Sequence, residues 1–213
     1  MRARIDCVIF DFGGVLSLPR DETRVASMAA LCGMDRTRFL SLYSAERAFL
    51  DQGRIDRDRY WSRILAGGAV SPSPEILERL GREDCDAWTR LNAPVHAWAA
   101  WLRSSGIITA ILSNMPRYIL DIMTSDSRFS WLASFSPAVF SCEVDLIKPD
   151  PRIYALCQDR VGIPAGRCLF LDDHQENVDA AGKAGMHALL FRSASEAARP
   201  ISRATRLPTK FLT

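Results

Sequence analysis

Six polar side chains able to do chemistry follow short apolar runs at four widely separated places in the chain. They are, in chain order, Asp11, Ser113, Asn114, Lys148, Asp172 and Asp173. Each of them taken alone is an ordinary turn or helix-cap residue. Together they supply three carboxylates, a hydroxyl, an amide and an ammonium group. Buried carboxylates repel one another unless a cation joins them, and Mg²⁺ is the hard cation that prefers such oxygen ligands.

The apolar runs themselves predict the strands that position these side chains. They lie at 5–11, 107–112, 138–141, 167–172 and 187–191. Helical patterns separate the later runs, as over Pro151 to Val161, where Gly162 marks the end of the helix. This alternation is typical of an α/β fold, a Rossmann-like parallel sheet with helices on both faces. The carboxyl ends of parallel strands face one crevice, so we expect the six side chains to meet there.

One interval, from Pro19 to about Leu91, contains helical patterns and no convincing strand. We interpret residues 19–91 as a small all-helical cap inserted after the first strand, with residues 1–18 and 92–213 forming the α/β core. The last 22 residues are rich in arginine and carry two prolines. We expect them to form a surface extension.

Composition narrows the class of protein. The 213 residues are 48% hydrophobic and 24% charged, with a formal net charge of +2, so we expect a globular chain without a nucleic-acid or membrane partner. The six cysteines contain no C-x-x-C pair, and no apolar run approaches a signal peptide core or a membrane span. These features predict a cytoplasmic protein with reduced thiols, either a monomer or a homodimer.

The stretches VIFDFGGVL, AILSNM, IKPDPRIY and LFLDDHQENVDAAGKAGM resemble the haloacid dehalogenase-like hydrolases, in the branch with a small helical cap after the first strand. The resemblance covers about residues 5 to 191. It implies that Asp11 is the nucleophile that takes a phosphoryl group as an aspartyl phosphate, while Ser113 and Lys148 hold the phosphate oxygens. It implies supporting polar roles for Asn177 and Asn114, with Asn114 and Gly14 on the substrate side.

The same resemblance implies a Mg²⁺ site. Its ligands would be Asp11, Asp173 and the main-chain carbonyl of Gly13, with Asp172 acting directly or through water. The physical logic agrees, because a carboxylate that attacks a phosphate dianion needs positive charge on the phosphoryl oxygens. The expected substrate is a small phosphorylated metabolite, and the expected reaction is phosphomonoester hydrolysis.

Gly13 departs from the pattern that the resemblance implies. Most phosphatases of the family carry a second aspartate there, which protonates the leaving oxygen and later activates water. Such help is worth about 10² to 10⁴ in rate. The departure leaves three hypotheses open. The first is a phosphatase for leaving groups that need little protonation, such as sugar 1-phosphates or acyl phosphates, or one helped by water or by a cap residue such as Asp21 or Glu22.

The second hypothesis is a phosphate- and Mg²⁺-binding protein with little turnover, and the third is carbon–halogen hydrolysis. Dehalogenases of the family need no metal, so the pair Asp172 and Asp173 argues against that role. A conformational explanation is compatible with the first hypothesis: Gly13 and Gly14 allow a tight turn. His174 fits a pocket wall better than a metal ligand, and Trp98 fits core packing better than a stacking platform. Asp145 also stands where relatives often carry glycine.

Overall fold

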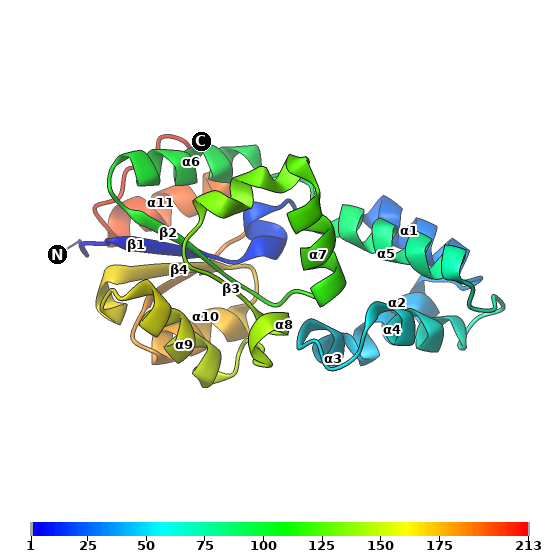
Figure 1. Cartoon of the computed structure of the whole chain (residues 1–213). Coiled ribbons are helices and arrows are strands. Elements are labelled where there is room, and N and C mark those ends of the chain that lie inside the picture. The colour runs from blue at the N-terminus through cyan, green and yellow to red at the C-terminus, as the bar shows by residue number, and fades with distance from the viewer. Residues whose placement is uncertain (1, 213) are drawn as a thin grey trace.

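A five-stranded parallel sheet is the centre of the larger part of the computed structural model, which describes residues 2–212 (Figure 1). Its strands are β1 Cys7–Phe10, β2 Ile108–Ser113, β3 Ala138–Phe140, β4 Cys168–Asp172 and β5 His187–Leu190. Their order across the sheet is β3-β2-β1-β4-β5, and every pair is parallel. The predicted α/β fold is therefore confirmed, with all five strands where the apolar runs lie.

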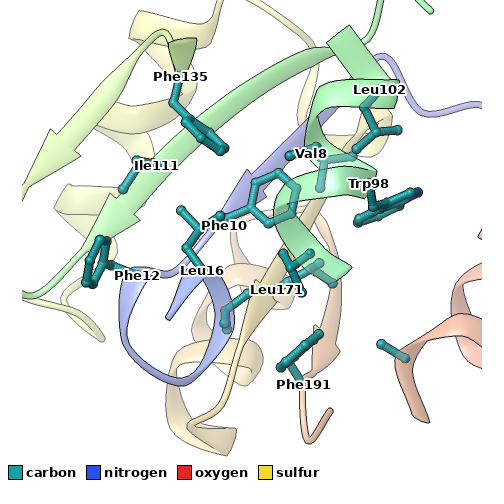
Figure 2. Close-up of a cluster of buried hydrophobic side chains, with 14 of the residues drawn as sticks. Val8, Phe10, Phe12, Leu16, Trp98, Leu102, Ile111, Phe135, Leu171 and Phe191 are labelled. Carbon is teal, nitrogen blue, oxygen red and sulfur yellow. The ribbon is translucent and has the colours of Figure 1, made fainter. Parts of the chain in front are cut away.

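Helices cover both faces of this sheet, so its central strands are buried on both sides. One face carries α6 Ala93–Ser104, α7 Arg117–Ser125 and α11 Ala194–Ala204, and the other carries α9 Pro151–Val161 and α10 Gln175–Lys183. Val8 and Phe10 of β1 pack on the first face, where Figure 2 shows Phe10 beside Trp98 of α6. Cys7 and Ile9, which alternate with them, pack on the second face.

The chain between β1 and α6 forms a separate helical block, seen at the right of Figure 1. It contains α1 Glu22–Leu31, α2 Arg36–Ala45, α3 Arg47–Asp51, α4 Arg57–Leu65 and α5 Pro74–Trp88. Phe39 and Trp61 are fully buried in a hydrophobic core of its own. Asp21, Asp35 and Asp56 cap three of these helices by accepting first-turn backbone N–H groups. We call α1–α5 the cap.

Shorter segments complete the chain. They are the turn Phe12–Leu16, the 3₁₀ segments Ser127–Ser134 and Ala165–Arg167, and the short helix α8 Ser141–Val144. Within residues 2–212, no helix is both long and apolar enough to cross a membrane.

The prediction of a C-terminal surface extension is wrong for residues 192–212. Helix α11 places Ala197 and Ile201 in the hydrophobic core, and Leu207 and Leu212 follow them there. The indole Nε1 of Trp98 donates a hydrogen bond to the carbonyl of Pro208 at 2.8 Å. Arg199 and Arg203 lie on the exposed side of α11, opposite its apolar face. The high arginine content of the segment hid this apolar face in the sequence.

Candidate active site

The strand ends and the cap enclose a cavity of about 540 Å³. Asp11 follows β1, Ser113 ends β2, and Asp173 follows the last residue of β4. These three side chains and Lys148 line the cavity on the side of the sheet. The structure thus brings together the groups that the sequence analysis selected, at the carboxyl edge of the sheet where ligands bind in open α/β folds.

Lys148 joins two of the carboxylates. Its Nζ lies 2.8 Å from Asp11 Oδ1 and 2.6 Å from Asp172 Oδ2, and all three side chains are buried. Burial raises the pKa of Asp11 to about 7, and the neighbouring acids act in the same direction, while Lys148 opposes them. The two carboxylates hold the pKa of Lys148 above its usual value although burial lowers it.

Asn114 fixes the loop that carries Lys148. Its Nδ2 donates to the carbonyl of Lys148 at 3.1 Å, and the backbone N–H of Lys148 donates to Asn114 Oδ1 at 2.8 Å. This reciprocal pair ties the end of β2 to a residue 34 positions later in the chain. Ser113 beside it is 2% exposed, and it lines the cavity with Asn114.

Asp172 and Asp173 have different surroundings although they are adjacent. Asp172 is fully buried and accepts hydrogen bonds from Lys148 Nζ, from the backbone N–H of His174 at 2.8 Å and from Asn177 Nδ2 at 3.0 Å. Asp173 lines the cavity with 31% of its side chain exposed, and its Oδ1 lies 2.7 Å from His174 Nδ1. This contact raises the pKa of His174 to about 9. His174 lines the cavity too, and its ring lies close enough to Asp172 and Asp173 for the three to share an ion, so its role as a pocket wall rather than a metal ligand stays a prediction.

The oxygen atoms around Asp173 fit a hard divalent cation. Asp11, Asp172 and Asp173 set three carboxylates against the ammonium of Lys148, so the cluster has an excess of negative charge. Asn177 Oδ1 is buried and has no hydrogen-bond partner among residues 2–212, so one oxygen acceptor is left open beside the acids. These donors are the kind that Mg²⁺ takes.

The two glycines of the turn after Asp11 differ in conformation. Gly14 has φ of +72°, and a Cβ there would lie 2.6 Å from Asp173 Oδ2, so this position requires glycine on both counts. Gly13 has φ of −66° and ψ of 129°, which any residue adopts. The conformational explanation is therefore right for Gly14 and wrong for Gly13. Gly14 contacts Asp173, and a substrate contact through its backbone stays a prediction.

The indole of Trp88 fills the space above Gly13. A Cβ at position 13 would lie 3.3 Å from both Cε3 and Cζ3 of the ring. Trp88 is the last residue of α5, and its Nε1 donates to the hydroxyl of Tyr43 at 3.0 Å. A side chain at position 13 would therefore begin in tight contact with the cap.

Several residues on the cap side of the cavity were not selected by the sequence analysis. Besides Trp88 they include Arg20, just before α1, and Tyr43, Arg47 and Asp51. Tyr43, Arg47 and Asp51 are spaced four residues apart, so the sequence did indicate that they could share one helix face. The same spacing also occurs on helix faces that are exposed to solvent, so it did not indicate a cavity. The suggested acids Asp21 and Glu22 do not line the cavity: one caps α1, and the other pairs with arginines at the surface.

A buried polar network holds the cavity face of the cap. Asp84 of α5 is fully buried and accepts from Tyr43 OH at 2.5 Å, from Arg47 Nη1 at 3.2 Å and from Tyr118 OH. Arg47 Nε also lies 2.8 Å from Asp51 Oδ1. Because Tyr118 belongs to α7 of the core, this network joins the cap to the core.

Asp145, the second departure from the family pattern, has a backbone conformation that glycine commonly adopts. It is the only non-glycine residue between positions 2 and 212 with a positive φ, at 52°, where glycine is the common choice. Its carboxylate lies 2.7 Å from Arg54 Nε of the cap. Nearby, the hydroxyl of Ser141 donates to the carbonyl of Asp51. The cap thus touches the core beside α8 as well as at α7.

A family model named haloacid dehalogenase-like hydrolase matches residues 5–185. The chain belongs to this family of hydrolases. Among curated proteins it is 27% identical over 198 residues to mouse acyl-CoA dehydrogenase family member 10, covering 85% of this chain and 17% of that protein. It is 26% identical over 211 residues to a phosphoglycolate phosphatase of Pseudomonas syringae pv. tomato, covering 92% and 72%.

Two further relatives extend the comparison. The chain is 25% identical over 213 residues to mouse bifunctional epoxide hydrolase 2, covering 92% of this chain and 38% of that one. It is 27% identical over 84 residues to an (S)-2-haloacid dehalogenase of Pseudomonas fluorescens, covering 39% of this chain and 36% of that one. The chain therefore spans well under half of the length of the first two mammalian relatives.

Solved structures agree on the fold. A predicted HAD-like family hydrolase of Porphyromonas gingivalis superposes with a TM-score of 0.76 at 21% identity, covering 94% of this chain and 98% of that one. A HAD family enzyme of Bacteroides thetaiotaomicron, solved with magnesium and inorganic phosphate, gives 0.70 at 19% identity, covering 87% and 93%.

Proposed function

We propose that this hydrolase cleaves a small phosphomonoester with Mg²⁺ bound, through an aspartyl phosphate on Asp11. The observation that carries the proposal is the position of Lys148 Nζ, within 2.8 Å of Asp11 in a cavity that Asp173 also lines. Nucleophile, cation and acidic cluster are thus together in one cavity. The phosphoglycolate phosphatase relative and the neighbour solved with magnesium and phosphate support the same substrate class.

In this proposal Asp11 attacks phosphorus with one carboxylate oxygen, and the alcohol oxygen leaves. Burial is the main cause of the raised pKa of Asp11, and the negative charge of Asp172 and Asp173 adds to it. Lys148 offsets part of that charge and binds a phosphoryl oxygen, and the hydroxyl of Ser113 binds another. Bound Mg²⁺ would supply the remaining positive charge on the phosphoryl oxygens. Water then hydrolyses the aspartyl phosphate.

The residues that would hold the metal are Asp11, Asp173 and the carbonyl of Gly13. Both carboxylate oxygens of Asp172 already accept hydrogen bonds, from Lys148, His174 and Asn177. This favours the prediction that Asp172 acts on the metal through water rather than as a direct ligand. Asn177 Oδ1 is an open acceptor for a metal-bound water. Asn114 would act through the Lys148 loop that it fixes.

The leaving group receives no proton from position 13. Trp88 fills the space next to Gly13, and Asp51, the cap carboxylate that lines the cavity, is paired with Arg47. We therefore propose substrates whose leaving oxygen departs as a weakly basic anion, such as sugar 1-phosphates or acyl phosphates. The dehalogenase alternative does not explain the pair Asp172 and Asp173, because dehalogenases of the family need no metal.

The experiment is a screen of phosphorylated metabolites and an aryl phosphate with Mg²⁺ and with a chelator, using Asp11→Asn as the matched variant. We expect Mg²⁺-dependent phosphate release that Asp11→Asn lowers at least a hundredfold, because the amide has nearly the same shape and is a poor nucleophile. More than a few per cent of residual activity in the pure variant would contradict the covalent mechanism. Tight phosphate binding without release by the native protein would favour the binding-protein alternative.

A further inference from the structure

Arg20 lines the cavity and carries a hydrogen-bond donor without a partner. Its side chain is 22% exposed and lines the cavity wall formed by the cap. Its Nη2 lies 3.2 Å from Glu22 Oε1, whereas its Nε is buried and has no hydrogen-bond partner among residues 2–212. A buried N–H of a charged group is costly to leave without an acceptor. The cavity therefore lacks an acceptor at this point.

The other lysine and arginine side chains that line the cavity pair with buried carboxylates. Lys148 is held by Asp11 and Asp172, and Arg47 is held by Asp51 and Asp84. Among the cavity-lining lysines and arginines that the structure describes, Arg20 is thus the one whose carboxylate partner is exposed. Its one carboxylate partner, Glu22, is half exposed and also pairs with Arg36 at 2.5 Å. An exposed pair of this kind holds a guanidinium weakly.

Two aromatic rings set the orientation of Arg20. Its guanidinium carbon lies 5.7 Å from the ring centre of Tyr43 and 5.7 Å from that of Trp88. The same indole reaches to 3.3 Å from the Cβ position of Gly13. Trp88 therefore extends from the loop of the nucleophile to Arg20, along the side where the leaving group of a phosphomonoester would lie.

We propose that Arg20 binds a second negatively charged group, a carboxylate or a phosphate, on the leaving-group part of the substrate. This inference rests on the proposed phosphomonoester hydrolysis and specifies its substrate class: sugar 1-phosphates or acyl phosphates that carry a second carboxylate or phosphate. The planar guanidinium suits either anion, since Nε and Nη2 form one edge of a donor fork. The anion would displace Glu22 from Nη2 and supply the acceptor that Nε lacks.

Binding of stable analogues tests the subsite without turnover. The probes are phosphonocarboxylates with one, two and three methylene groups, each compared by calorimetry with the alkylphosphonate of the same length, in the presence of Mg²⁺. We expect one chain length to bind at least tenfold more tightly than its uncharged counterpart, and Arg20→Gln to abolish that difference. Arg36→Gln is the control, because Arg36 shares Glu22 but does not line the cavity. Equal binding of every pair, or an unchanged difference in Arg20→Gln, would overturn the proposal.

Kinetics separate this inference from the proposed function. Phenyl phosphate tests hydrolysis alone, and 4-carboxyphenyl phosphate adds the second charge. We expect Arg20→Gln to lower kcat/KM at least tenfold for the charged ester, mainly through KM, and less than threefold for the neutral one. Equal effects on both esters would refute the subsite and leave the hydrolase intact. Failure to hydrolyse either ester would count against the proposed function, and the analogue binding would then decide the role of Arg20.

Discussion

Replacing Gly13 by aspartate tests why this chain lacks the second acid. The backbone at Gly13 has φ of −66° and ψ of 129°, so an aspartate there meets no left-handed strain. Its Cβ meets the indole of Trp88 at 3.3 Å, which is closer than the roughly 3.5 to 4.0 Å of an ordinary carbon–carbon contact. The substitution can therefore add an acid only if Trp88 moves.

The gain from an added acid and the cost of its close contact with Trp88 are of comparable magnitude. A well-placed acid is worth about 10² to 10⁴ in rate, roughly 3 to 5 kcal/mol. Overpacking of this kind costs about 1 to 3 kcal/mol, and Trp88 is restrained by its hydrogen bond to Tyr43. We therefore expect Gly13→Asp alone to gain less than tenfold on alkyl phosphates. Combined with Trp88→Leu, which removes the clashing ring, it should gain at least tenfold over Trp88→Leu alone.

The assay is kcat/KM for the native protein, both single variants and the double variant over esters whose leaving groups range from activated phenols to alcohols. The gain in the double variant should grow as the leaving group becomes more basic, and should stay below threefold for activated aryl phosphates. A full gain from Gly13→Asp alone would show that Trp88 does not block the acid. A uniform loss in a folded, Mg²⁺-binding double variant would refute the missing-acid reasoning altogether.

Three further predictions follow from the site and the cap. Asp173→Ala should weaken Mg²⁺ binding at least tenfold in calorimetry, whereas Asp159→Ala, on the exposed side of α9, should not change it; equal affinities would place the metal elsewhere. In the metal-free protein, NMR should give His174 a pKa of about 9. Any stabilisation of the fold by the protonated imidazole is then fully present below the ordinary imidazole pKa and is lost as the pH rises through 9. Asp173→Ala should bring the pKa of His174 back toward 6.5, and an unchanged value would rule out the contact with Asp173. Asp84→Ala should cost about 3 to 5 kcal/mol in denaturant unfolding, because it removes a fully buried partner from Arg47, whose side chain is 19% exposed, and from the buried hydroxyl of Tyr43. A cost below about 1 kcal/mol would mean that the network contributes little.

The sequence predicted the core of the site because parallel-sheet topology imposes it. Once Asp11, Ser113 and Asp172 are placed at the ends of parallel strands, their meeting at one edge needs no knowledge of loop conformation. Lys148 is the harder case, since it lies in a loop. Its position depends on the two hydrogen bonds between the Lys148 backbone and the Asn114 side chain, which no pattern in the sequence encodes.

The C-terminal segment shows how composition misleads when periodicity is set aside. The arginines and prolines of residues 192–213 suggested a solvated tail, yet Ala197 and Ile201 stand four residues apart on the face of α11 that packs on the sheet. Pro200 lies inside that helix and did not prevent it. The apolar spacing, rather than the charge, was the informative signal.

The contribution of the cap to the site could not be predicted, because it depends on how two separately packed units meet. The position of Trp88 relative to Gly13 follows from the length and direction of α5 and from the network of Asp84 that ties the cap to α7. Neither residue alone suggests the contact, since Gly13 reads as a missing acid and Trp88 as the end of a helix. In the folded chain they form one feature. The indole that an aspartate at position 13 would press against also contacts Arg20, so the missing acid and the proposed role of Arg20 involve the same packing of Trp88.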